Sequence, residues 1–184
     1  LSEAPGVIFL KSLDTSDNWT VYVGAEGNTK AMFLNLTNAK TTSTGYWNDS
    51  SPTASVFSLG NDTQVNKTGD SFIAYCFHNV EGYSQANYYY KGNGNVNGPF
   101  IYTGFRPAYV LIKNIDSANG WMIMDDKRNT YNVLDKSLDA QDGAAEVDED
   151  MLDFVSNGFK LRTTSGARNT NDDSYMYLAF AASP

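Results

Sequence analysis

The segment Ala4–Asp14 (APGVIFLKSLD) returns 102 residues later as Arg106–Asp116 (RPAYVLIKNID). Each copy then reaches a tryptophan after the same number of residues, at Trp19 and at Trp121. Further along, Asp70–Phe77 (DSFIAYCF) matches Asp173–Phe180 (DSYMYLAF) at an offset of 103. Because proline, lysine, aspartate and tryptophan keep their register over so long a distance, the sequence predicts a duplicated unit of about 100 residues.

Each copy is predicted to form antiparallel strands. Residues 7–13 and 109–115 are apolar runs rich in β-branched and aromatic side chains, which is typical of strands. Turn-forming residues follow at 14–18 and 116–120, and a second strand is expected to start at each tryptophan. The last strand of each copy is apolar at both odd and even positions, which predicts that both of its faces are covered.

Three further segments give local signals. Residues 144–154 (AAEVDEDMLDF) are compatible with a turn or two of helix or with a loop that leads into a strand. Asn157-Gly158 lies between apolar segments and predicts a hairpin. Residues 81–105, which join the two copies, are expected to form a hairpin in which 83–90 pairs toward 100–105, with an exposed Gly/Asn-rich tip.

About a dozen short strands with frequent turns predict an all-β protein. The expected architecture is one antiparallel β-sandwich of the jelly-roll kind over residues 1–184, with internal repeats at 4–80 and 106–184. Two small tandem β-domains are the alternative. We favour one domain because a lone unit with strands apolar on both faces would leave apolar surface uncovered.

The composition and charge of the chain argue against several classes of function. Hydrophobic residues make up 41% of the 184 residues, charged residues only 18%, and the formal net charge is −8. Scattered basic residues in an acidic chain argue against nucleic-acid binding, and no apolar run is long enough to span a membrane. The lone Cys76 excludes an intrachain disulfide framework. Because Leu1 is not methionine, we expect a fragment or a processed product.

The sequence nominates no catalytic, metal or cofactor site, so we expect a protein that is not an enzyme. His78 is the only histidine, and no nucleophile-elbow or phosphate-binding glycine motif occurs. Asp125 and Asp126 are most simply interpreted as solvated loop charges. The loops at 14–18 and 116–120 have oxygen ligands suited to calcium, but the second keeps one carboxylate, Asp116, which favours ordinary turn chemistry.

Binding through aromatic side chains is better supported. Aromatic rings stack on the apolar faces of sugars, while neutral amides and carboxylates bond to their hydroxyls, and tyrosine and tryptophan offer large contact area at low entropic cost. The alternative is that these rings fill the core, which we expect for Trp19 and Trp121. The candidate glycan-binding residues are Trp47, Tyr83, Tyr88, Tyr89 and Tyr90.

Five strings stand out for their residue order: 74–77 (AYCF), 81–84 (EGYS), 98–108 (GPFIYTGFRPA), 126–129 (DKRN) and 154–163 (FVSNGFKLRT). Together they resemble a known family, a repeat domain in the virion proteins of tailed, marine-type bacteriophages. The resemblance covers nearly the whole chain, and its most specific string is 154–163.

The resemblance implies a concanavalin-like β-sandwich and a non-enzymatic structural role in a phage particle. On that basis we expect a tail, tail-fibre or capsid-surface component of the virion that contributes to host-surface attachment. Its expected partners are other virion subunits, further copies of itself and a host-surface glycan, with no nucleic acid and no membrane. The alternatives are a carbohydrate-binding module and a glycan depolymerase that uses Asp125 or Asp126.

Overall fold

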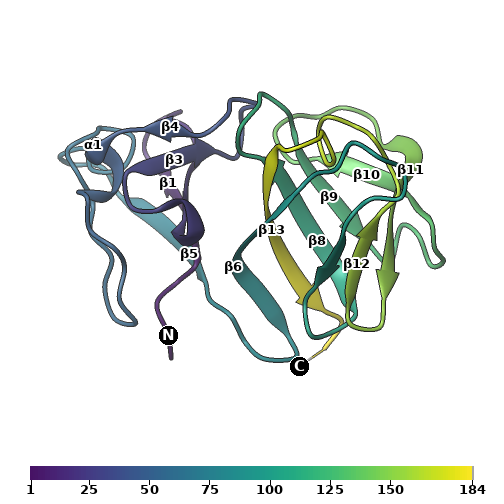
Figure 1. Ribbon diagram of the computed structural model, residues 1–184. Helices are drawn as coiled ribbons and strands as arrows, with labels where there is room; N and C mark the ends of the chain where they lie inside the picture. Colours follow the sequence, from purple (N-terminus) through teal and green to yellow (C-terminus); the bar gives the residue numbers. More distant parts are fainter. Residues whose placement is uncertain (184) are drawn as a thin grey trace.

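The computed structural model describes residues 1–183, and its regular structure is almost entirely antiparallel β-strand (Figure 1). One α-helical turn, α1 (Thr44–Trp47), and one 3-10 turn, η1 (Gly24–Glu26), interrupt the strands. The strands are β1 (Val7–Ser12), β2 (Thr20–Val23), β3 (Lys30–Phe33), β4 (Thr41–Thr42), β5 (Phe72–Phe77), β6 (Ser84–Lys91), β7 (Phe100–Tyr102), β8 (Pro107–Asn114), β9 (Trp121–Asp125), β10 (Leu134–Asp139), β11 (Val147–Val155), β12 (Gly158–Leu161) and β13 (Ser174–Ala181). The prediction of an all-β, antiparallel protein is therefore confirmed.

The strands form two sheets. The smaller has the order β4-β3-β2-β1-β5, and the larger has the order β6-β13-β8-β9-β10-β11-β12-β7. The larger sheet curls until it is nearly closed (Figure 1). Its two edge strands are β6 and β7. The runs β5-β1-β2-β3 and β13-β8-β9-β10 have the same order, so matching sequence segments occupy matching places in the two sheets.

The loops that follow β1 and β8 are closed by the same hydrogen bonds. Ser12 Oγ accepts from the N–H groups of Asp14 and Thr15, both at 3.2 Å. At the equivalent place, Asn114 Oδ1 accepts from the N–H groups of Asp116 and Ser117, at 3.0 and 2.9 Å. Short polar side chains that bond the backbone two or three residues ahead are the turn chemistry expected from the sequence.

Inside the curl of the larger sheet, apolar and aromatic side chains form one core. Fully buried members include Val110, Met124, Met151, Phe159 and Tyr175. Their burial explains why β8, β11 and β12 are apolar on the face that points inward. The interior of the curled sheet is thus filled by side chains.

A second core lies between the two sheets. The smaller sheet contributes Val7, Val21 and Met32, while the larger contributes Trp121 and Leu178 among others. Trp121 is fully buried, and its Nε1–H donates to the carbonyl of Phe33 at 2.8 Å, so the indole also bonds across the interface. Both tight packing and a buried hydrogen bond therefore connect the two sheets.

A third core lies on the outer face of the smaller sheet, under the segment that contains α1. Ile8 and Leu10 from β1 pack there with Tyr22, Trp47 and Val65. Strand β1 is consequently covered on both faces, which is why its residues are apolar at odd and even positions alike. The same holds for β13, whose residues 175–179 are all buried.

Three details of the chain differ from expectation. Strand β6 pairs with β13 and β7 pairs with β12, so the predicted hairpin of 83–90 with 100–105 is wrong. Segment 144–154 contributes strand β11 and no helix, because Met151, Leu152 and Phe154 are needed in the core of the curled sheet. In β5, Ala74 and Tyr75 are exposed, so the cover predicted for both faces is incomplete.

Other local predictions are confirmed. β1 and β8 lie where the two apolar runs predicted strands, and β9 begins at Trp121. The hairpin signalled by Asn157-Gly158 is formed by β11 and β12, with the turn one residue earlier, at 156–157. The Gly/Asn-rich tip at 93–97 is exposed, and it is tied down by Asn169, whose Nδ2 donates to the carbonyl of Asn95 at 2.8 Å.

Candidate functional site

A pocket of about 510 Å³ lies where the two edges of the curled sheet approach each other. One wall is the outer edge of β6, and the opposite wall is the end of β7 with the turn that follows it. The turn before β6 and one residue near the N-terminus close the rest of the rim. The lining residues are Glu3, Asn79, Val80, Glu81, Gly82, Ser84, Gln85, Tyr88, Tyr102, Thr103 and Gly104.

Two exposed aromatic rings belong to this pocket, one from each wall. Tyr88 of β6 is 48% exposed and Tyr102 of β7 is 63% exposed. Exposed rings are common on this surface, but these two share one pocket, and their free faces are available to a ligand. Each ring combines an apolar face with a hydroxyl that both donates and accepts hydrogen bonds.

Gln85 is held in place at the base of the same strand. Its Oε1 accepts a 2.5 Å hydrogen bond from the hydroxyl of Tyr177. Burial raises the pKa of Tyr177 above its usual value, so the phenol stays protonated and continues to donate. This bond fixes the orientation of the Gln85 amide, and its Nε2 donates to no residue of the described chain, so it is free to donate to a ligand.

Other polar residues of the rim have structural partners. Asn79 Oδ1 accepts from the N–H of Ala86 at 2.8 Å, and Ser84 Oγ donates to the carbonyl of His78 at 3.0 Å. Gly82 has a φ of 74°, which a residue with a side chain would adopt only at a cost, so the tight turn before β6 depends on it. The rim is therefore preformed.

The charge of the pocket is negative. Glu3 and Glu81 are both exposed, and none of the described residues that line the pocket is a lysine, arginine or histidine. An anionic ligand would meet like charge here, whereas a neutral polyol would find carboxylate acceptors, amide and hydroxyl groups and two aromatic faces. The lining therefore selects against phosphate- or sulfate-bearing ligands.

Two of the five aromatic residues predicted to bind glycan are buried. Trp47 is 1% exposed, packs edge-to-face on Tyr22 and donates from Nε1 to the carbonyl of Lys30 at 3.0 Å. Tyr90 is 8% exposed and donates from its hydroxyl to the carbonyl of Arg168 at 2.7 Å. Both rings fill cores beneath the surface, so neither can present a face to a sugar.

The remaining three lie at the surface in different places. Tyr88 lines the pocket, as described. Tyr89 is 52% exposed and, because successive side chains of a strand alternate, points away from Tyr88. Tyr83 is half-buried against Phe180, with ring centroids 6.0 Å apart, and does not line the pocket.

Sequence reasoning did not nominate Gln85, Tyr102 or the two glutamates. The aromatic segment 98–108 is typical of a strand that contains Tyr102, but only the closure of the sheet brings β7 opposite β6. The sequence carried only a partial signal: side chains alternate along a strand, so Phe100 and Tyr102 share the face opposite to apolar Ile101, but nothing local places that face beside β6.

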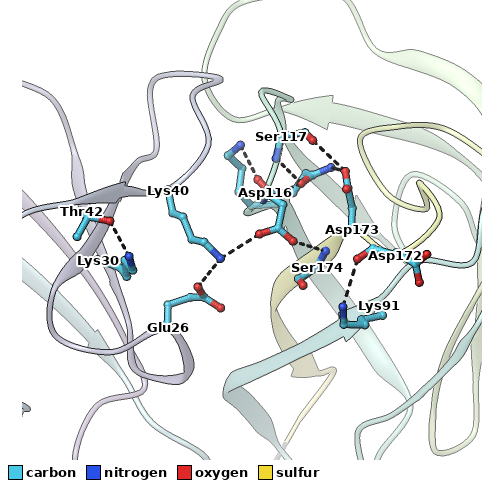
Figure 2. A network of polar contacts seen from close by, with 12 residues as sticks. Glu26, Lys30, Lys40, Thr42, Lys91, Asp116, Ser117, Asp172, Asp173 and Ser174 are labelled. Atoms are coloured by element: carbon cyan, nitrogen blue, oxygen red, sulfur yellow. Dashed lines mark hydrogen bonds and ion pairs between the residues drawn. The ribbon is translucent and has the colours of Figure 1, made fainter.

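A separate polar network connects the two sheets near the loop after β8 (Figure 2). Lys40 Nζ lies 2.8 Å from a carboxylate oxygen of Glu26 and 2.9 Å from one of Asp116. The other oxygen of Asp116 accepts from the N–H of Ser174 at 2.8 Å. The network thus joins the segment between β3 and β4 to the start of β13.

The charges in this network perturb one another. Partial burial alone would lower the pKa of Lys40, but hydrogen bonds and attraction from Glu26 and Asp116 outweigh it and raise the pKa. Burial would likewise raise the pKa of Asp116, but Lys40 and the Ser174 N–H stabilise its charged form and lower it. The ion pairs are therefore intact at neutral pH and serve a structural purpose.

The carboxylates of the loops considered for calcium are used in bonds within the protein. In loop 14–18, Asp14 Oδ2 accepts from the N–H of Ser71 and Asp17 Oδ2 accepts from Thr15 Oγ1, both at 2.5 Å. In loop 116–120, the Asp116 carboxylate bonds to the N–H of Ser174 and to Lys40, as described. The neighbouring Asp173 and Asp70 are used in the same way, since they accept from Asn114 Nδ2 at 2.8 Å and from Ser12 Oγ at 3.0 Å, respectively. Over residues 1–183, no group of three or more histidine, cysteine, aspartate or glutamate side chains is placed to hold a metal ion.

Asp125 ends β9, Asp126 begins the turn that follows, and both carboxylates have partners within the protein. Asp125 Oδ1 accepts from the N–H groups of Lys127 and Arg128, both at 2.9 Å, and the carboxylate pairs with the Arg128 guanidinium at 2.9 Å. Asp126 lies 3.2 Å from Lys127 Nζ and 3.8 Å from a nitrogen of Arg106. These contacts shape the turn, and neither aspartate lines the pocket between β6 and β7.

Taken together, the molecule is an all-β protein with two antiparallel sheets and an acidic, tyrosine-lined pocket at the open edges of the larger one. Within the described part of the chain, the helices are too short to cross a membrane. The chain belongs to the family described as a domain of unknown function, DUF7483, whose model matches residues 1–184. Searches of curated proteins and of solved structures return no match to the chain.

Proposed function

We propose that this protein is a non-enzymatic attachment module that binds a neutral glycan in the pocket between β6 and β7. The observation that carries the proposal is the pairing of Tyr88 and Tyr102 on opposite walls of one preformed pocket. Two rings that face one space can hold the apolar faces of a sugar ring, and the carboxylates of Glu3 and Glu81 are acceptors for its hydroxyls.

The place of action that we propose is the surface of a phage particle, on the tail or the capsid. The support is the resemblance of strings such as 98–108 and 154–163 to a repeat domain of virion proteins of tailed phages. A low content of charged residues and sheets closed over three cores suit a rigid, protease-resistant surface protein. Other virion subunits and further copies of the chain are the proposed protein partners.

We also infer that the architecture is a β-sandwich made from two repeats. The matching strand orders β5-β1-β2-β3 and β13-β8-β9-β10 support this inference. So do the matching bonds of Ser12 and Asn114 to the turns that follow them, and of their partners Asp70 and Asp173. The core between the sheets, which contains side chains of both, is the interior of the proposed sandwich.

The binding proposal is tested with a glycan array of host-surface polysaccharides, followed by calorimetry on the best ligand. The Tyr88→Ala variant should bind at least about tenfold more weakly, a loss of about 1.4 kcal/mol. Tyr89→Ala is the matched control, because this adjacent tyrosine is equally exposed but lies outside the pocket. Tyr102→Ala should resemble Tyr88→Ala.

Two outcomes would refute the glycan site. One is that no glycan on the array binds the wild-type protein, and the other is that Tyr88→Ala and Tyr89→Ala lose affinity equally. The particle assignment is tested separately, by mass spectrometry of purified virions. Absence of peptides from this chain in those particles would end that part of the proposal.

A further inference from the structure

Among the described residues 1–183, no strand lies beside the outer edge of β5. β5 is the last strand of the smaller sheet, and in this part of the chain it pairs only with β1. Its sequence, FIAYCF, contains no charged residue and no proline. Natural proteins usually protect an edge strand with lysine, proline, a bulge or a covering element, because free backbone groups recruit another strand. This edge lacks the first two safeguards.

The backbone geometry shows which groups are free. The carbonyls of Ser71 and Phe77 accept from the N–H groups of Leu13 and Gly6, both at 2.8 Å, so the odd-numbered residues bond toward β1. In an antiparallel ladder the intervening residues then point their N–H and C=O groups the other way. Those residues are Phe72, Ala74 and Cys76, whose backbone groups bond to no described residue.

The equivalent strand of the larger sheet, β13, has a hydrogen-bonded neighbour on both sides. β13 occupies the place of β5, pairs with β8 on one side and pairs with β6 on the other. Over the part of the chain that the structure describes, the smaller sheet has no strand corresponding to β6. Within the repeated strand order, β5 therefore lacks the neighbour that its counterpart has.

Side chains next to the β5 edge are likewise more exposed than their counterparts in the other repeat. Tyr75 is 46% exposed, and its ring stacks on that of Trp19 with centroids 6.3 Å apart; nearby, Leu13 is 63% exposed. Their counterparts by sequence, Leu178, Trp121 and Ile115, are no more than 2% exposed in the core between the sheets. An apolar surface thus continues from that core to the β5 edge and stays uncovered there.

We propose that β5 pairs antiparallel with β5 of a second copy across a two-fold axis, which joins the two smaller sheets into one of ten strands. With the axis at Ala74, the two Ala74 residues oppose each other and Phe72 of each copy opposes Cys76 of the other. The free N–H and C=O groups of Phe72, Ala74 and Cys76 are then all hydrogen-bonded across the axis. Shifting the register by two residues would leave some of these groups without a partner. A two-fold contact uses the same surface twice and closes after two copies.

A second copy is the occupant that the observations favour. The strand has no charge, so two identical edges meet without the repulsion expected between chains of net charge −8. The pairing would also bring the exposed Tyr75 rings of both copies close to the new junction. The proposal does not depend on the glycan pocket, which lies on the other sheet, so either can fail alone.

The test begins with sedimentation equilibrium of the full chain, which should give a two-chain species. Ala74→Lys places two like charges at the two-fold axis and should weaken the dimer at least about tenfold, because lysine is a natural blocker of edge pairing. Val96→Lys is the matched control, since Val96 is 62% exposed in the loop between β6 and β7, and it should leave the dimer unchanged.

Crosslinking keeps the proposal falsifiable if Ala74→Lys disturbs folding. In a Cys76→Ser background, Ala74→Cys should be joined to its copy by a short bis-maleimide, since hydrogen-bonded antiparallel pairs have Cα atoms about 5.5 Å apart. Val96→Cys in the same background should stay uncrosslinked. A wild-type protein that is monomeric at all concentrations, or a dimer that Ala74→Cys fails to crosslink, would overturn the proposal.

Discussion

Trp121→Ala should destabilise the whole molecule, because Trp121 is the largest side chain buried between the two sheets. Removing a fully buried aromatic side chain costs about 3–5 kcal/mol. The indole hydrogen bond to the Phe33 carbonyl adds only about 0.5–1 kcal/mol, since that carbonyl also accepts from the Leu36 N–H. Loss of the ring beneath the Lys113 ammonium, 5.9 Å away, adds a similar amount.

The expected total is therefore about 4–7 kcal/mol, a large part of the 5–15 kcal/mol that stabilises an ordinary domain. Guanidinium denaturation followed by far-UV and near-UV circular dichroism measures it. Trp19→Ala is the internal comparison, because Trp19 holds the matching place in the other sheet. It is only half-buried and stacks on exposed Tyr75, so its loss should cost about 1–2 kcal/mol.

The two probes should report one coincident transition for the wild-type protein and for both variants. Equal costs for Trp121→Ala and Trp19→Ala would refute the reasoning from burial. Two separate transitions, of which Trp121→Ala shifts only one, would show that the sheets unfold independently and that the core between them contributes little.

Three further predictions concern other contacts. Burial lowers the pKa of Lys113 to about 8 from 10.5, so its ammonium should titrate near pH 8 by NMR, and a titration near 10.5 would contradict this. Between about pH 8 and 10.5 the unfolded chain binds more protons at this lysine than the folded chain, so the contribution of Lys113 to the free energy of unfolding should rise with pH over that range. Because Lys40 lowers the pKa of Asp116, the contribution of this carboxylate to stability is present at neutral pH and is lost as the pH falls through its folded-state pKa. Asp116→Asn should lower the free energy of unfolding by under about 1 kcal/mol at neutral pH, and the melting temperature of the variant should fall less steeply on acidification than that of the wild-type protein. Gly6→Ala would place a Cβ 1.9 Å from the carbonyl oxygen of Ala86, so a fall in melting temperature is expected, and an unchanged value would show that β6 can move away.

The strands were predictable from the sequence where a single physical cause determines them. β1 and β8 are covered on both faces, so their apolar runs are continuous, and the turns after them are closed by side chains whose types favour turns. The segment that became β11 was ambiguous because its first residues are acidic and exposed. Only Met151, Leu152 and Phe154 supply the burial that makes it a strand.

The pairing of β6 and β7 was not predictable from local signals. A Gly/Asn-rich segment between two aromatic strands is typical of a hairpin, yet β6 pairs with β13 and β7 with β12. The sheet closes through contacts between residues distant in the chain, and no local pattern encodes them. The candidate site depends on that closure, so Tyr88 could be nominated from composition while its partner Tyr102 could not.

Aromatic content alone also could not separate ligand contacts from core. Trp47 and Tyr90 have the residue types expected of a glycan site, but each has a hydrogen-bond partner inside the protein and a ring packed against others. The alternation along β6 gives Tyr89 and Tyr90 opposite environments although they are adjacent. Burial, which the fold determines, distinguishes them.

The buried Lys113 has a consequence for attempts to divide the gene. Its ammonium donates to the carbonyls of Asn114 and Asn119, at 2.8 Å each, and to that of Thr37, at 3.1 Å, which comes from the first half of the chain. A truncated product that begins after the first sheet would lack that acceptor and would expose Trp121 to water. Expression of either half by itself should therefore give insoluble material, whereas co-expression of the two fragments offers a route to a reassembled, soluble protein.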